Sequence, residues 1–168
     1  MSPDDIGLAL ESEKSDWNFS IVQSKKILNL QLDGDAAADA ICRALPSATR
    51  EHLKWFVRAL GDFAWPGAIL VLTDVLKRPG DYWDKLERAE AVARCGGQDG
   101  FRFLIEGLDA SNRSDNNTFI SNATGYMNAL VKLDYRGAAP YVRAFLSRWG
   151  PSGWPAEAAR AFLARHTA

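Results

Sequence analysis

Cysteine, histidine and long apolar runs are scarce in this 168-residue chain, and these scarcities exclude several classes of protein. Two cysteines allow at most one disulfide, which excludes a disulfide-stapled secreted scaffold and favours a reducing compartment. The longest unbroken apolar run, 68–72, has five residues, so no segment is predicted to span a membrane. The first five residues, MSPDD, are acidic where a signal peptide is basic and then apolar. The sequence therefore predicts a cytoplasmic protein without a membrane partner.

Groups that carry chemistry are also few. The two histidines, His52 and His166, are 114 residues apart, and neither has a second histidine at zinc-protease spacing. Cys42 and Cys95 each occupy an apolar helical position, where a buried thiol is the expected state. The glycines are isolated, so no phosphate-binding loop opens a helix. We therefore expect a non-catalytic protein with no cofactor and no metal ion.

One acidic pair, Glu87 and Glu90, has a spacing that a general acid–base site could use. However, Glu90 lies four residues before Arg94, and Asp84 lies four residues before Arg88. This spacing is typical of ion pairs along a solvated helix face. The sequence thus predicts surface salt bridges at these positions.

Helix-forming residues dominate the composition, with 43 Ala and Leu against 14 Val and Ile. No segment alternates apolar and polar residues in the manner of a strand. Ser47 is predicted to cap one helix, Asp81 and Asp84 to form a capping box for another, and 111–115 to be a loop. Two helices are expected before residue 33 and a third ends at 45–46. The later ones cover 47–60, 66–78, 81–95, 99–109, 116–133, 137–149 and 155–166.

The helices repeat along the chain. Gly34, Gly67, Gly100 and Gly137 recur at intervals of 33, 33 and 37 residues, each at the start of a helix that follows another helix. Apolar residues after the last three glycines share one register: Ala68, Val71, Leu72 and Val75; Phe101, Leu104, Ile105 and Leu108; Ala138, Tyr141, Val142 and Phe145. A two-helix period near 33 residues indicates units that bury their apolar faces against neighbouring units.

The segments 88–96, RAEAVARCG, and 100–108, GFRFLIEGL, form an alanine-rich first helix, a glycine bend and a leucine-rich second helix. This pattern resembles HEAT-like α-solenoid repeats, closely over 47–149 and loosely over 17–46. The resemblance implies an all-α fold in one domain, 1–168, built as a right-handed α-solenoid of about four hairpins. The units are 17–46, 47–79, 81–110 and 115–149, with an extra N-terminal helix and a C-terminal helix at 154–166. The first-helix proline and the Asp/Arg ladder of HEAT units are missing, so armadillo-like packing, another hairpin packing and an irregular bundle stay open.

Solenoids of this kind bind partners on a concave surface lined by second helices. We expect that surface to carry Asp35, Asp39, Arg43, Thr73, Lys77, Arg102, Glu106, Arg143 and Ser147. Their mixed charge suits a reversible contact that is steered by charge. The leading prediction is a protein-binding module with one protein partner. The chain also resembles bacterial immunity proteins, which makes a toxin domain the specific hypothesis for that partner; a general adaptor or assembly factor is an equal alternative.

Charge and tryptophan offer two further binding features. Residues 1–40 carry eight acidic and three basic side chains. From residue 136 onward the chain carries five arginines and only one acidic residue, Glu157. Binding through the acidic first forty residues is therefore an alternative to binding through the concave surface. Trp65, Trp83 and Trp154 stand at helix starts, where they could anchor a partner, although core packing is the commoner role.

One basic stripe indicates an alternative function. Arg50, Lys54 and Arg58 recur every four residues along one predicted helix and could track the phosphates of a nucleic acid. No other helix continues the stripe, and the formal net charge of the chain is −1. Because duplex-binding domains are usually strongly basic, the sequence favours a solvated outer helix face over nucleic-acid binding.

Overall fold

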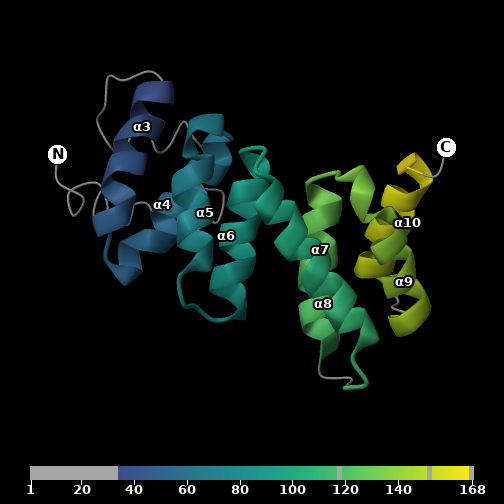
Figure 1. The fold of residues 1–168 in the computed structure, drawn as a ribbon. Coiled ribbons are helices and arrows are strands. Elements are labelled where there is room, and N and C mark those ends of the chain that lie inside the picture. The colour runs from purple at the N-terminus through teal and green to yellow at the C-terminus, as the bar shows by residue number, and fades with distance from the viewer. Residues whose placement is uncertain (1–33, 117–118, 151–152, 167–168) are drawn as a thin grey trace. The chain divides into compact units, whose positions relative to one another are not determined.

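The computed structural model describes residues 34–116, 119–150 and 153–166, and within them the chain is all-helical, with no strand (Figure 1). Eight α-helices occur there: α3 (Gly34–Ala44), α4 (Arg50–Phe63), α5 (Ile69–Lys77), α6 (Tyr82–Arg94), α7 (Gln98–Arg113), α8 (Ile120–Lys132), α9 (Ala139–Trp149) and α10 (Trp154–His166). Three 3₁₀ turns join them: η1 (Leu45–Ser47), η2 (Pro66–Ala68) and η4 (Arg136–Ala138). The predicted all-α class is confirmed, while the two helices expected before residue 33 lie outside the described residues.

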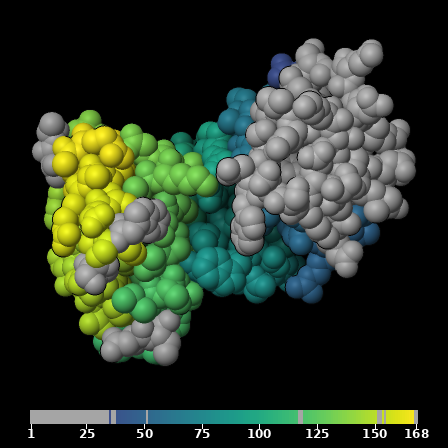
Figure 2. Space-filling view, turned by 180° about the vertical axis from the view of Figure 1, so that it is seen from behind, coloured from purple at the N-terminus to yellow at the C-terminus, as the bar shows by residue number. Residues whose placement is uncertain are grey.

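The chain divides into two compact units, Met1–Gln98 and Asp99–Ala168. In the first unit α3 packs on α4, and α4 and α5 both pack on α6. In the second unit α8, α9 and α10 pack on one another, and α10 lies on the surface in yellow in Figure 2. The largest fully buried side chains are Ile41, Leu45, Phe56, Leu60 and Leu72 in the first unit and Leu104, Leu108, Met127, Phe145 and Phe162 in the second.

Three bends between consecutive helices have a common form. A left-handed residue lies one position past the end of α4 and two positions past the ends of α6 and α8: Ala64 has φ 49°, Gly96 φ 90° and Asp134 φ 51°. This conformation lets backbone N–H groups bond back to the last carbonyls of the helix, as from Gly97 to Val92 and from Tyr135 to Leu130. The sequence repeat therefore corresponds to a repeated helix-ending geometry.

The periodic glycines lie at these bends, as the sequence predicts. Gly67 is in η2, Gly137 is in η4, and Gly100 is in the first turn of α7. A Cβ at Gly67 would lie 2.7 Å from the Trp65 ring, and one at Gly137 would lie 2.6 Å from the Tyr135 ring. Each glycine thus provides the space in which the aromatic residue two positions earlier folds over the turn.

Helix starts agree with the capping pattern except at Ser47. Asp81 accepts a hydrogen bond from the Asp84 N–H at 2.8 Å and caps α6 as predicted. The prediction that Ser47 caps the next helix is wrong: Thr49 is the N-cap of α4 and accepts from the His52 N–H at 3.2 Å. Ser47 instead ends η1, where its hydroxyl donates to the Ala44 carbonyl.

The predicted loop at 111–115 is also wrong in its first half, because α7 continues to Arg113 and so passes the predicted unit boundary at 110. Ser111 and Asn112 are buried. The Ser111 hydroxyl donates to the Gly107 carbonyl at 2.8 Å, while Asn112 donates to the Tyr141 carbonyl at 3.1 Å and accepts from Trp149 Nε1 at 3.2 Å. The two partners of Asn112 lie on α9. Tertiary hydrogen bonds therefore satisfy a polar side chain in a segment whose composition is typical of a loop. The following helix, expected from 116, begins at Ile120.

Several polar side-chain contacts within each unit join residues about one repeat period apart. In the first unit Arg58 pairs with Glu87, 29 residues away, and Arg94 with Asp62, 32 residues away. In the second unit Trp149 bonds Asn112 over 37 residues, and Arg165 bonds Asp134 over 31. Because 58 and 62 face 87 and 94 in the same order, α4 and α6 run side by side in the same direction.

Candidate functional site

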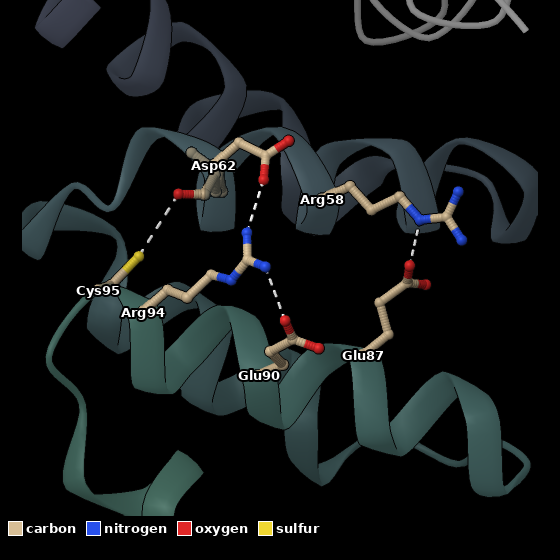
Figure 3. Close-up of polar contacts among 7 residues, drawn as sticks. Arg58, Asp62, Glu87, Glu90, Arg94 and Cys95 are labelled. Carbon is tan, nitrogen blue, oxygen red and sulfur yellow. Dashed lines mark hydrogen bonds and ion pairs between the residues drawn. The ribbon is translucent and has the colours of Figure 1, made fainter. Parts of the chain in front are cut away.

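Ion pairs join the C-terminal parts of α4 and α6 (Figure 3). Arg58 Nε donates to Glu87 Oε1. Arg94 donates from Nη1 to Asp62 Oδ1 and from Nη2 to Glu90 Oε1, both at 2.7 Å. All five side chains are part-buried, which strengthens each charge-assisted bond relative to a fully exposed pair. At this end of the helix pair every charge has an opposite partner.

A groove of about 350 Å³ lies beside these ion pairs, toward the N-terminal halves of the same two helices. Its apolar floor is formed by Leu53 and Val57, which are 7% and 1% exposed. The remaining lining residues are charged: Arg50 and Lys54 on α4, and Asp84, Glu87 and Arg88 on α6. The groove therefore has a basic wall, a mixed wall and an apolar base.

Among the described residues, no acidic side chain forms an ion pair with the basic wall. Within the part of the chain that the structure describes, neither Arg50 nor Lys54 has an acidic partner within ion-pair distance, and both side chains are exposed. Lys54 Nζ lies 4.9 Å from the centre of the Trp55 ring, and the Arg58 guanidinium lies 5.3 Å from it. This contact orders the lysine stem by a cation–π attraction but leaves the ammonium accessible.

Arg88 holds the opposite wall in place. It is 6% exposed, and its Nη1 donates to the carbonyls of Val75, Arg78 and Pro79 at 3.4, 3.1 and 3.2 Å. Asp84 lies 3.8 Å from its other nitrogen. The predicted spacing of this pair is confirmed, but its predicted solvated setting is wrong, because Arg88 turns inward to satisfy the carbonyl groups at the end of α5. Arg94 departs from the prediction in the same way, since it also reaches Asp62 on α4.

Arg50 and Lys54 of the predicted phosphate-tracking stripe line the groove, whereas Arg58 is not among the lining residues. Arg58 is already paired with Glu87. Asp84 and Glu87 also line the groove opposite the two remaining cations. A continuous row of phosphates would meet these carboxylates, so the acidic wall opposes nucleic-acid binding at this surface.

The predicted partner-binding row is found on four helices of the two units. On α3, Asp35 is exposed and Asp39 pairs with Arg43 at 2.8 Å. On α5, Thr73 is half-buried and Lys77 is exposed and pairs with Asp74 at 3.2 Å. The second unit presents exposed Arg102 and Glu106 on α7 and exposed Arg143 and Ser147 on α9; Arg102 also pairs with Asp99.

The two most exposed large apolar side chains of the described residues lie outside the predicted row. Leu70 on α5 is 81% exposed, and Trp83 on α6 is 63% exposed with Tyr82 packed edge-on against it at 4.8 Å. The position of Trp83 at a helix start is the sequence signal that finds it. Leu70 carries no such signal, because it stands inside an apolar run that also holds the fully buried Ala68 and Leu72.

The remaining reactive groups are shielded or tied to the fold. Burial raises the pKa of both the Cys42 and the Cys95 thiol to about 11. Hydrogen bonds from Arg165 and His166 hold the pKa of the Asp134 carboxyl below its ordinary value. Among the residues that the structure describes, no three His, Cys, Asp or Glu side chains gather as a metal site, and no helix has the length and apolar character needed to cross a membrane.

No family model, no curated protein and no solved structure matches the chain. The resemblance to HEAT-like repeats therefore rests on the repeat register and on the residues that carry it.

Proposed function

We propose that the chain is a HEAT-like α-solenoid that acts as a non-catalytic protein-binding module. The observation that carries the solenoid proposal is a set of polar contacts within each unit that join residues 29 to 37 positions apart, which is one helical-hairpin period. Stacked repeats contact their neighbours in this way. The same-direction packing of α4 and α6 and the recurrent left-handed bends support the same arrangement.

The second helices supply the proposed binding surface. α7 and α9 keep Leu104, Val142 and Phe145 buried, while they present Arg102, Glu106, Arg143 and Ser147 to solvent. Arg143 has no acidic partner among the described residues, and exposed unpaired charges steer the approach of a complementary partner. One protein partner is proposed, and a toxin neutralised by this chain is the specific form that the resemblance to immunity proteins implies.

The test begins with identification of the partner by affinity capture from the native cell, followed by calorimetric titration of that partner. Reversal of charge in Arg102→Glu/Arg143→Glu should weaken binding or slow association, because both side chains are exposed on second helices. The matched control is Arg113→Glu/Arg160→Glu, which makes the same change in net charge at exposed positions outside the row.

Equal affinity of the wild type and the Arg102→Glu/Arg143→Glu variant for the partner would show that the row lies outside the interface. Turnover of a small molecule by the purified chain, with no protein captured, would contradict the binding-module proposal as a whole. For the toxin hypothesis, co-expression of the captured partner with this chain should restore growth that the partner alone suppresses.

A further inference from the structure

We propose that the groove between the N-terminal halves of α4 and α6 docks an acidic segment of the protein partner, with Arg50 and Lys54 as the cations that receive its carboxylates. The inference rests on the proposed protein-binding function. It adds a second contact surface, on first helices, and it specifies the chemistry of the segment that occupies that surface.

The two ends of the α4–α6 pair differ in how their charges are matched. α4 presents Arg50, Lys54, Arg58 and Asp62 at intervals of four residues. Arg58 and Asp62 meet Glu87 and Arg94 of α6. Arg50 and Lys54 continue the same row, yet they meet no acidic side chain among the described residues. Carboxylates brought by a partner would extend the pattern that the protein itself completes at the other end.

The apolar floor makes the groove more than a pair of surface cations. Leu53 and Val57 lie at its base, between the basic wall and Arg88. A segment that carries an apolar side chain near two acidic ones can bury that side chain on the floor while its carboxylates reach Arg50 and Lys54. Burial of apolar surface contributes affinity that is independent of salt, whereas the ion pairs contribute steering and specificity.

The spacing of the two cations fixes the spacing of the acids. Four residues along an α-helix correspond to about 6 Å. Two residues along an extended chain correspond to about 6.6–6.8 Å, so acids at positions i and i+2 of an extended segment match Arg50 and Lys54. A Glu-Leu-Glu triplet supplies this acidic pair together with one apolar side chain, and it is therefore the minimal probe.

A protein segment fits this groove better than a nucleic acid does. Asp84 and Glu87 stand on the far wall, where they repel an unbroken line of phosphates. Discrete carboxylates can be placed on the basic wall alone, and a neutral or basic side chain can be placed opposite Asp84. The groove therefore selects a short acidic stretch over a polyanion of uniform charge.

In the experiment, the protein is titrated with a synthetic peptide of repeated Glu-Leu-Glu-Gly units, and the binding affinity is measured by calorimetry at low and high salt. Three forms are compared: the wild type, Arg50→Glu/Lys54→Glu, and the control Arg113→Glu/Arg160→Glu. We expect the groove variant to lose at least about tenfold in affinity, because both ion pairs become repulsive, and the control to bind as the wild type does. A peptide with Gln in place of Glu should bind more weakly to the wild type.

Folding does not obscure the result, since Arg50 and Lys54 are exposed and a helical circular dichroism spectrum with an unchanged melting temperature verifies each variant. Equal peptide affinity of the wild type and the groove variant overturns the proposal. Tighter binding of a DNA duplex than of the peptide overturns it in favour of nucleic acid, and a concentration-dependent dimer that only the groove variant abolishes overturns it in favour of a second copy of the chain.

The two proposals fail separately. If Arg102→Glu/Arg143→Glu weakens binding of a captured partner and the groove variant binds the peptide as the wild type does, the groove is excluded as a binding site. The binding-module proposal then still stands. If the groove variant alone loses the acidic peptide, the groove proposal is supported even when the second-helix row proves to be outside the interface.

Discussion

Gly61 of α4 lies against Ala91 of α6 so closely that a Cβ at position 61 would be 3.1 Å from the Ala91 Cα. Backbone atoms cannot move aside as the end of a flexible side chain can. The glycine therefore sets the distance between the two helices, and the ion pairs of Arg58 and Arg94 form across the interval that it permits. Gly61 is in a helix interior, where its low helix propensity would otherwise be a cost.

Substitution Gly61→Ala should lower the free energy of unfolding by about 1 kcal/mol, because overpacking against Ala91 exceeds the gain in helix propensity. Urea denaturation of the single variants Gly61→Ala and Ala91→Gly and of the double variant forms a complete cycle. The cycle should give a favourable coupling of at least about 0.5 kcal/mol. A Gly61→Ala protein that is more stable than the wild type would contradict this prediction, because it would mean that the two helices can move apart without loss of packing energy.

Substitution Arg88→Met should destabilise the protein by about 2–5 kcal/mol. It keeps most of the side-chain volume but removes the donor to three carbonyls and leaves the end of α5 without its buried partner. The control Arg102→Met changes an arginine whose guanidinium pairs with Asp99 in solvent, and its effect should be within about 0.5 kcal/mol. Equal denaturation midpoints for the two variants would contradict the structural role of Arg88.

Leu104 and Leu70 have the same side chain at opposite extremes of burial, 0% and 81% exposed. Leu104→Ala should cost about 2–5 kcal/mol through lost burial and a residual cavity. Leu70→Ala should change stability by no more than about 0.5 kcal/mol. Thermal melting of both variants checks the assignment, and a Leu104→Ala protein that melts with the wild type would show that this face of α7 is not packed.

The thiols of half-buried Cys42 and buried Cys95 predict a loss of stability in alkaline solution. The pKa of Cys42 and of Cys95 is about 11 in the folded chain against 9.0 ordinarily, so the unfolded chain releases these protons first as the pH rises. Their contribution to stability is complete below pH 9.0 and is lost between about pH 9 and 11. Urea midpoints of the wild type should therefore fall more steeply across that interval than those of a Cys42→Ala/Cys95→Ala variant, and parallel curves would contradict the prediction.

The helical class and the bends could be predicted because they depend on local signals. The glycine period finds the turns at Gly67 and Gly137, and the Asp81–Asp84 box finds the start of α6. The left-handed residues Ala64 and Asp134 escape such reasoning, since neither is a glycine. Their conformation follows from the helix end and from the aromatic residue that packs over the next turn.

The site could be predicted only in part, because its character depends on which charges meet across helices. The spacing of Arg50, Lys54 and Arg58 is visible in the sequence, but the pairing of Arg58 with Glu87 is not. Arg88 illustrates the same limit: its i,i+4 acid predicts a surface ion pair, while three carbonyls at and just beyond the end of the preceding helix draw it inward. Asn112 is misassigned to a loop for the same reason, since its partners lie on α9.

The inward turn of Arg88 also has a consequence for the order of folding. α5 has nine residues, fewer than a helix needs to persist by itself in water. The Val75 carbonyl in its last turn and the Arg78 and Pro79 carbonyls just beyond it accept hydrogen bonds from Arg88, which takes up its position only once α6 has formed. The two helices should therefore form and open as one cooperative element, and native-state hydrogen exchange should give the slow amides of α5 and α6 a common opening free energy.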